Sequence, residues 1–117
     1  MKNSDRDHPT ILIVEDIDWI RLGMKKAVEH EGYRAMEASN DVEAFQIAER
    51  EPLQLILTEE ELPTFDALMA RLRENLSLSC IPVVIINPDV EGGERYGNAY
   101  LLADYADIAS LLSILRC

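Results

Sequence analysis

The sequence is short of basic residues, cysteine and long apolar runs, and each shortage excludes a class of protein. Lys and Arg total 11 against 22 Asp and Glu, so the net charge of −11 repels nucleic acid and anionic membranes. No apolar run approaches the length of about 20 residues that crosses a bilayer, and the polar start MKNSDRDHP is unlike a signal peptide. The cysteines lack metal-ligand spacing, and we expect Cys80 to be a half-buried thiol. We therefore expect a cytoplasmic protein that contacts neither nucleic acid nor membrane, and whose partners are basic proteins or metal ions.

The length and the apolar content suit one folded domain. With 117 residues, of which 48% are apolar, the chain can bury a single two- or three-layer core but not two separate ones. We therefore predict one domain over residues 1–117, in which residues 1–9 form a flexible N-terminal tail.

Apolar runs of strand length alternate with helical patterns along this chain. The runs at 11–14, 55–57 and 83–86 are rich in β-branched residues and do not alternate with polar ones, which is typical of central parallel strands. Segments 33–38 and 99–102 suit edge strands, and apolar residues at helical spacing predict helices before Gly32, before Pro52, around 68–72 and over 108–115. This alternation predicts a doubly wound parallel sheet, whose functional crevice lies at the carboxyl ends of the strands.

Acidic residues stand at the ends of two of the predicted central strands. Glu15 and Asp16 follow the first run, and Glu59 follows the third predicted strand. Carboxylates at neighbouring strand ends form the oxygen-only kind of site that Mg²⁺ prefers, and without a metal their repulsion should raise at least one pKa. The alternative is that Glu15 and Asp16 only cap the first helix, where acidic residues face the positive end of its dipole.

Four stretches together resemble a response-regulator receiver domain of two-component signalling: ILIVED at 11–16, EGYRAMEASN at 31–40, LILTEEELP at 55–63 and IPVVIIN at 81–87. The resemblance covers nearly the whole chain and implies a flavodoxin-like (βα)5 fold with a parallel sheet in the order 2-1-3-4-5. It implies that Glu15 and Asp16 hold Mg²⁺ or another divalent cation, together with Glu59 and the backbone carbonyl of Glu61. No glycine- or hydroxyl-rich phosphate loop follows the first strand, so we expect no organic cofactor such as a flavin.

The same resemblance exposes substitutions at the positions that receivers use for phosphorylation. Glu59 stands four residues before Pro63, where receivers carry the phosphoacceptor aspartate. Asn87 replaces a Ser or Thr, Ala103 replaces a lysine, and Tyr100 matches the switch aromatic, although simple packing would also explain a tyrosine there. Misplacing a nucleophile by an ångström costs on the order of 10²-fold in rate, and the lost lysine removes a cation from the site. We therefore do not expect phosphorylation of the ordinary receiver type.

The stretch 88–98 is shorter than its counterpart in receivers and contains three of the five glycines. We predict that the fourth helix of the fold is cut to about one turn or replaced by a loop. The reshaped surface, with the segment 99–102 and the last helix, is the predicted contact region for a partner.

Three functions remain open at this point. The first is an atypical receiver, or pseudo-receiver, that acts by phosphorylation-independent contact with a signalling kinase, an output protein or a second copy of itself, with Glu59 either a mimic of the phosphorylated state or an inactive remnant. The second is a receiver-like switch gated by a divalent cation in the acidic pocket. The third is a small metal-dependent phosphohydrolase, against which counts the lack of a nucleophile paired with a base. We therefore do not expect an enzyme.

Overall fold

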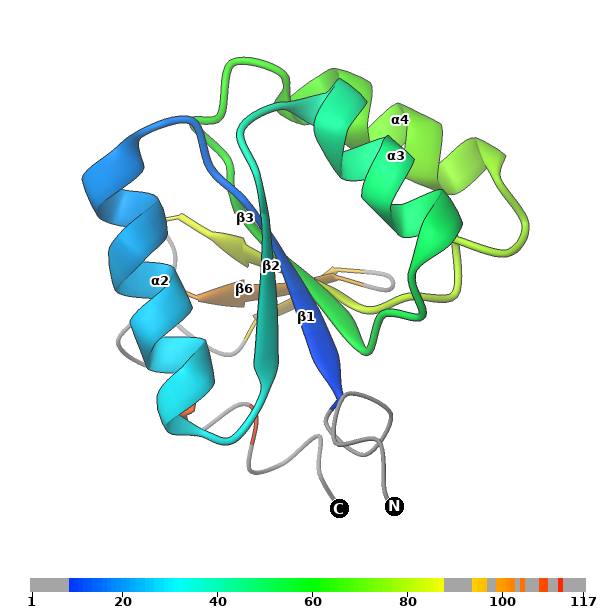
Figure 1. Cartoon of the computed structure of the whole chain (residues 1–117). Helices are drawn as coiled ribbons and strands as arrows, with labels where there is room; N and C mark the ends of the chain where they lie inside the picture. The colour runs from blue at the N-terminus through cyan, green and yellow to red at the C-terminus, as the bar shows by residue number, and fades with distance from the viewer. Residues whose placement is uncertain are drawn as a thin grey trace, which may run out of the picture.

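The computed structural model describes residues 9–87, 94–96, 99–102, 104, 108–109 and 112, and it contains a six-stranded sheet flanked by helices (Figure 1). The strands are β1 (Thr10–Val14), β2 (Arg34–Ala38), β3 (Leu55–Glu59), β4 (Val83–Ile86), β5 (Glu94–Tyr96) and β6 (Ala99–Leu102). The helices with defined bounds are α2 (Asp18–His30), α3 (Asp41–Arg50) and α4 (Phe65–Glu74). Of the predicted tail, residues 1–8 lie outside the described part, whereas the Pro9 carbonyl accepts the Arg34 N–H at 2.9 Å.

The sheet has the order β2-β1-β3-β4-β6-β5, and each neighbouring pair from β2 to β6 is parallel. Because β6 is the fifth parallel strand along the chain, the predicted order 2-1-3-4-5 is confirmed. The chain passes from β1 to β2 on one side of β1, and α3 then returns it past β1 to β3 on the other side, so the strand order reverses at β1. The carboxyl ends of β1 and β3 therefore border the crevice where sheets of this kind bind their ligands.

Successive residues of β1 divide between two apolar cores, one on each face of the sheet. Leu12 and Val14 pack with residues of α3 and α4, whereas Ile11 and Ile13 pack with residues of α2, and all four are fully buried. Figure 1 shows α2 on one side of the sheet and α3 with α4 on the other. With both faces covered, the central strands need no polar alternation, which explains their continuous apolar runs.

The predicted last helix is described only at residues 108–109 and 112, which are helical. Ile108 and Leu112 are buried in the core on the α2 face of the sheet. The remaining residues of that prediction lie outside the described part of the chain.

The segment before β6 differs from the prediction. Residues 94–96, expected in a loop or a single helical turn, form β5, which pairs antiparallel with β6 so that Glu94 lies opposite Leu101. The strand at 99–102 is therefore not the edge strand that we predicted. Only two residues separate β5 from β6, which is the length of the tightest hairpin connections. Pairing gives the backbone groups of the two strands hydrogen-bond partners within the protein, whereas in a loop those groups would bond to water. Residues 88–93, 97–98 and Ala103 lie outside the described part of the chain.

Helix α3 has Asn40 as its N-cap, and Glu43 in its first turn accepts hydrogen bonds from Ser39, the residue before the cap. The Asn40 side chain accepts the Glu43 N–H at 3.0 Å, and the Glu43 carboxylate accepts the Ser39 N–H at 2.7 Å and the Ser39 hydroxyl at 2.9 Å. These two donors hold the pKa of Glu43 below its ordinary value. The Asn40 side chain thus satisfies the Glu43 N–H, one of the backbone donors that a helix start leaves without an intrahelical partner.

The exposure of Cys80 differs from the prediction. Cys80 is exposed, not half-buried as predicted, because it lies in the turn that follows α4. None of the helices that the structure describes combines the length and the apolar character required to span a bilayer.

Candidate functional site

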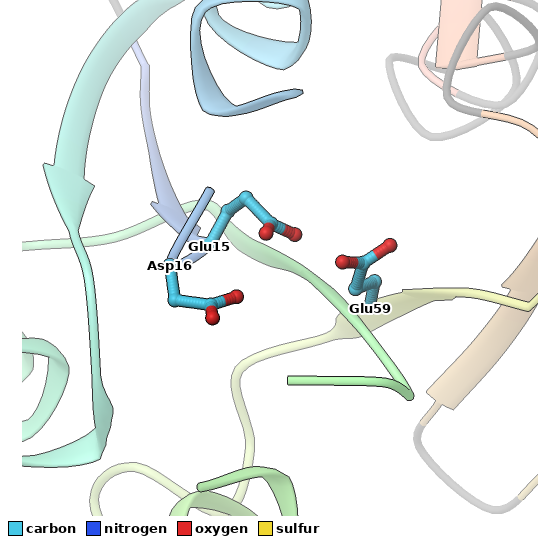
Figure 2. Close-up of side chains that lie close together, drawn as sticks. All are labelled: Glu15, Asp16 and Glu59. Carbon is cyan, nitrogen blue, oxygen red and sulfur yellow. The ribbon is translucent and has the colours of Figure 1, made fainter. Parts of the chain in front are cut away.

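Carboxylates from two neighbouring strand ends form the candidate site. Glu15 and Asp16 follow β1, Glu59 is the last residue of β3, and one oxygen of each lies within 4.8 Å of the others. The two strand ends are adjacent because Val14 pairs with Thr58, whose hydroxyl also donates to the Val14 carbonyl at 3.0 Å. Figure 2 shows the Glu15 and Glu59 carboxylates turned toward one another, with Asp16 beside them. The structure thus brings together the three acidic residues that the sequence singled out.

The three carboxylates differ strongly in burial. Glu15 is fully buried, Glu59 is half-buried, and Asp16 is exposed. The Glu15 N–H donates to the Ala38 carbonyl at 3.0 Å, which continues the pairing of β1 with β2 by one residue. Because successive side chains of an extended chain point to opposite sides, Glu15 turns inward and Asp16 turns to solvent.

The two oxygens of Glu15 have different surroundings. Its Oε2 accepts the Ile17 N–H at 2.9 Å, at the residue that precedes α2. Its Oε1 is buried and accepts no hydrogen bond from the described residues. A buried acceptor without a donor costs about 1–3 kcal/mol, so Oε1 requires a proton or a cation. One oxygen of Glu15 therefore serves the start of the helix, as the capping alternative expected of Glu15, and the other is left buried without a donor among the described residues.

The pKa of Glu15 is raised from 4.5 to about 8. Burial is the largest cause, because it removes water from the charged form, and the facing Glu59 carboxylate adds to it. The N–H of Ile17 opposes the shift by stabilising the carboxylate. The expectation that crowding would raise at least one pKa is met by Glu15, although burial contributes more than like charge.

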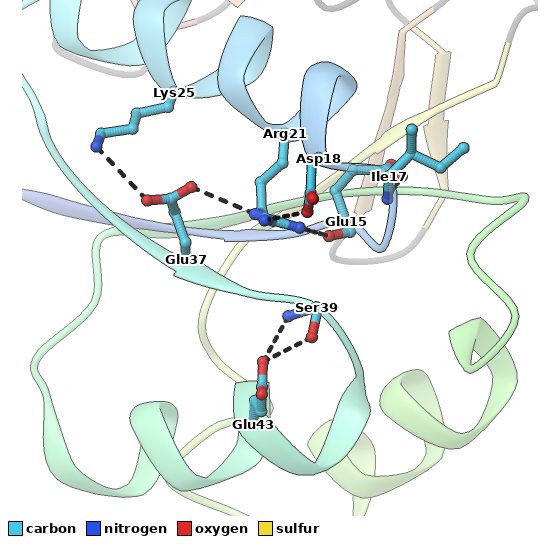
Figure 3. A network of polar contacts seen from close by, with 8 residues as sticks. All are labelled: Glu15, Ile17, Asp18, Arg21, Lys25, Glu37, Ser39 and Glu43. Carbon is cyan, nitrogen blue, oxygen red and sulfur yellow. Dashed lines mark hydrogen bonds and ion pairs between the residues drawn. The ribbon is translucent and has the colours of Figure 1, made fainter.

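Arg21 holds the loop between β1 and α2, and the sequence analysis did not single it out. Its Nη1 donates to the Glu15 carbonyl at 2.8 Å, and its guanidinium contacts Asp18 at 2.6 Å and Glu37 at 3.3 Å (Figure 3). Lys25 lies 3.5 Å from the same Glu37 carboxylate. The i, i+3 spacing of Asp18 and Arg21 was a visible signal, but the contact with Glu37 of β2 depends on strand pairing.

Glu60 is a second residue that the sequence analysis did not select. The Asn87 side-chain amide donates a hydrogen bond to the Glu60 carboxylate, and the Glu60 N–H donates to the Ile86 carbonyl at 3.1 Å. We predicted Asn87 at the position that contacts a phosphoryl group beside Glu59, and the structure places its amide against Glu60. The run of three glutamates gave no sign of which one would reach β4.

Glu61 and Tyr100 are the other predicted positions that the structure describes. Glu61 is exposed, and the next residue, Leu62, donates its N–H to the Glu59 carbonyl at 3.1 Å, which closes a turn. Tyr100 is half-buried and packs against the core on the α2 face. Ala103 is not among the described residues.

The sequence is similar to parts of a histidine kinase and of a transcriptional regulatory protein. The sequence matches no protein-family model. It is 31% identical over 85 residues to histidine kinase P4 of Formosa agariphila, and 32% identical over 101 residues to the transcriptional regulatory protein SrrA of Staphylococcus aureus. These alignments cover 71% and 82% of this chain, but only 6% and 42% of the relatives. The chain therefore spans less than half the length of either relative.

Comparisons with solved structures agree on the fold. The chemotaxis response regulator CheY4 of Vibrio cholerae superimposes with a TM-score of 0.75 at 16% identity, over 92% of this chain and 98% of that one. The receiver domain of sensor histidine kinase PA1611 from Pseudomonas aeruginosa, solved with a magnesium ion in its active site cleft, has a TM-score of 0.77 at 23% identity, over 93% and 95% of the two chains. This chain has the fold of the response-regulator receiver domains of two-component systems.

Proposed function

We propose that the chain is a receiver domain of two-component signalling that acts by protein–protein contact and does not take up a phosphoryl group. The observation that carries this proposal is Glu59. It ends β3 within 4.8 Å of the Glu15 and Asp16 carboxylates, at the position where receivers carry their phosphoacceptor aspartate.

The chemistry of the site supports this proposal. Phosphoryl transfer depends on in-line positioning and on neutralising the charge of the transferred group. Glu59 is one methylene longer than aspartate, and the sequence has Ala103 where receivers have a lysine. The Asn87 side-chain amide, at the position where receivers have a Ser or Thr hydroxyl, donates a hydrogen bond to the Glu60 carboxylate.

The same geometry supports a role for Glu59 as a fixed charge. A phosphoryl group brings about −1.5 to −2 charges, of which one carboxylate supplies a part. The half-buried Glu59 carboxylate lies beside the buried Glu15, so its charge is close to the interior of the fold. We propose that the partner is a signalling kinase, an output protein or a second copy of the chain.

The test of this proposal is the intact mass of the protein after incubation with Mg²⁺ and acetyl phosphate. We expect no added phosphoryl mass, while an ordinary receiver with aspartate at this position is modified under the same conditions. The proposal is wrong if the chain gains one phosphoryl group that is lost in Glu59→Gln and kept in Glu60→Gln. Glu60→Gln is the matched control because it makes the same charge change one residue away.

A second candidate function is a switch that responds to a divalent cation. It is favoured by the buried Oε1 of Glu15, which accepts no hydrogen bond from the described residues and lies in a cluster of three carboxylates. Glu15, Asp16 and Glu59, with the backbone carbonyl of Glu61, would hold the ion. A bound divalent cation would neutralise negative charge on the three carboxylates. Oxygen ligands of this kind suit Mg²⁺ or Ca²⁺.

Thermal unfolding with increasing Mg²⁺ or Ca²⁺ tests this second candidate. A cation that binds the folded state raises the melting temperature as its concentration exceeds Kd, so we expect a rise at millimolar cation. Asp16→Asn should remove most of this rise, while the matched change Asp66→Asn, at an exposed position on α4, should keep it. An equal rise in both variants, or none in the parent chain, would count against the switch.

A further inference from the structure

A partly open cavity of about 640 Å³ lies beside α4, on the face of the sheet that also carries α3. We call it the β4–α4 groove. Its lining is mostly apolar and includes six residues from α4, the turn after it, β4 and β6: Phe65, Met69, Ile81, Val83, Ile85 and Leu101.

The exposure of the sheet on this face increases toward the groove. Ile56 of β3 is 0% exposed, Ile85 of β4 is 5% exposed, and Leu101 of β6 is half-buried. Phe65 and Met69 of α4 are also half-buried where they border the groove. Figure 1 shows α3 and α4 side by side, and α4 is the last helix on this face in the part of the chain that the structure describes. The helical layer therefore covers β1 and β3 completely and β6 only in part.

The two ends of the groove differ in charge. Glu60 and Asp66 lie at the end where the carboxyl ends of the strands meet the start of α4, and both are exposed. Arg73 lies near the other end, in the last turn of α4. A helix presents partial positive charge at its N-terminus and partial negative charge at its C-terminus. The charges of the groove thus favour a helix whose N-terminus lies at Glu60 and Asp66.

We propose that the β4–α4 groove binds an amphipathic helix of a protein partner, with the basic N-terminal end of that helix at Glu60 and Asp66 and its C-terminal end at Arg73. The inference rests on the proposed function as a protein-contact domain and specifies where the contact is made. Helices recognised in this way insert an apolar stripe with i, i+3, i+4, i+7 spacing into an apolar groove.

The length of the groove sets the length of the helix. The wall formed by α4 is 10 residues long, which corresponds to about 15 Å at 1.5 Å per residue. A partner helix of about three turns would lie along it, at the spacing of about 8–10 Å that packed helices adopt.

Two of the chain's undescribed segments, 1–8 and 88–93, are poor occupants by composition, and the last helix has Ile108 and Leu112 buried on the other face of the sheet, beside α2. Residues 88–93 read PDVEGG and offer one aliphatic side chain, Val90, and residues 1–8 offer only Met1. Neither segment can supply an apolar helical stripe.

A second copy of the chain is disfavoured by charge. Each copy carries a net charge of −11, so two copies repel one another. Trp19 and Leu22 of α2 are exposed apolar side chains, but α2 begins with Asp18, which would meet the acidic end of the groove. A basic partner helix has the complementary charge.

The experiment is a selection of helical peptides against the full chain. The probe is a displayed library of helices of about four turns, with a fixed apolar stripe and randomised remaining positions. We expect enriched sequences to carry Lys or Arg in the first turn and Asp or Glu in the last. Amide chemical shifts of the full chain should change at groove residues when such a peptide is added.

Variants of the chain test whether the selected peptides bind in the β4–α4 groove. Met69→Glu, in the groove wall, should weaken binding at least ~10-fold, as loss of a central apolar contact does. Leu76→Glu should leave binding unchanged, because Leu76 is 89% exposed after α4 and is not among the lining residues. The double exchange Asp66→Lys with Arg73→Glu, at two exposed positions, should reverse the preferred charge order of the peptides. The amide spectrum of each variant reports whether it folds.

Three results would overturn the inference. The first is a selection in which no helix maps to the groove, and the second is a set of binders with no preference for charge order. The third is a dimer in sedimentation velocity that Met69→Glu dissociates, which would make a second copy the occupant. Phosphoryl uptake in the mass measurement would overturn the proposed function while leaving peptide binding in place, so the two failures can be distinguished.

Discussion

At the scale of single residues, the buried Glu15 predicts a pH dependence of stability. Its pKa is about 8 in the folded protein and near 4.5 in an exposed chain, so between these values the folded state keeps a proton that the unfolded state releases. Its contribution to stability is complete below about pH 4.5 and is lost as the pH rises through 8, by up to about 1.4 kcal/mol per pH unit.

The variant Glu15→Gln isolates this effect. Glutamine keeps the size of the side chain without titrating, so the free energy of unfolding should fall less between pH 5 and pH 8 than in the parent chain. Urea unfolding in the presence of a chelator at several pH values measures the slope. Glu61→Gln, at an exposed position, is the control and should retain the parental slope. An unchanged slope in Glu15→Gln would show that other groups cause the pH dependence.

The inward direction of Glu15 could not be predicted from the sequence. Glu15 and Asp16 are adjacent carboxylates after the same strand, and which of them turns inward depends on the Glu15 N–H bond to the Ala38 carbonyl. That bond requires the register of β1 with β2, in which Val14 pairs with Ala38. Residue identity located the cluster, and tertiary pairing determined its burial.

At the scale of secondary-structure elements, the N-cap Asn40 of α3 predicts a measurable cost when its side chain is removed. Asn40→Ala removes the acceptor of the Glu43 N–H, and loss of such a cap costs about 1 kcal/mol. Chemical denaturation should therefore show a lower midpoint with an unchanged slope. Gln46→Ala, at an exposed position in the middle of α3, should be neutral or slightly stabilising. A neutral Asn40→Ala would mean that Glu43 and Ser39 hold the helix start without it.

The elements differed in how well their sequences predicted them. The central strands were predictable because their β-branched runs are buried on both faces, and α2 and α3 because apolar residues recur at helical spacing up to Gly32 and Pro52. Strand β5 was not predictable, because Glu-Arg-Tyr has no apolar alternation and lies between glycines. Its structure comes from pairing with β6, a tertiary contact that local pattern does not report.

At the scale of the whole molecule, the topology could be predicted from the sequence. The surface around residues 88–98 could be predicted only in part. Alternation of strand and helix predicted a doubly wound parallel sheet, because right-handed crossovers leave few arrangements, and the resemblance to receivers implied the strand order that the structure has. The shortness of residues 88–98 indicated that the surface near β4 would differ from that of receivers. It could not show that β5 would extend the sheet beyond β6, or that α4 would border a groove.

The position of Glu60, between the groove and the carboxylate cluster, has a thermodynamic consequence. Glu60 lines the β4–α4 groove, and it directly follows Glu59 of the carboxylate cluster. A basic helix end beside Glu60 and a cation among the carboxylates would therefore both act on the turn after β3. Any coupling free energy between them is reciprocal: if the helix weakens the affinity for the cation by some factor, the cation weakens the affinity for the helix by the same factor.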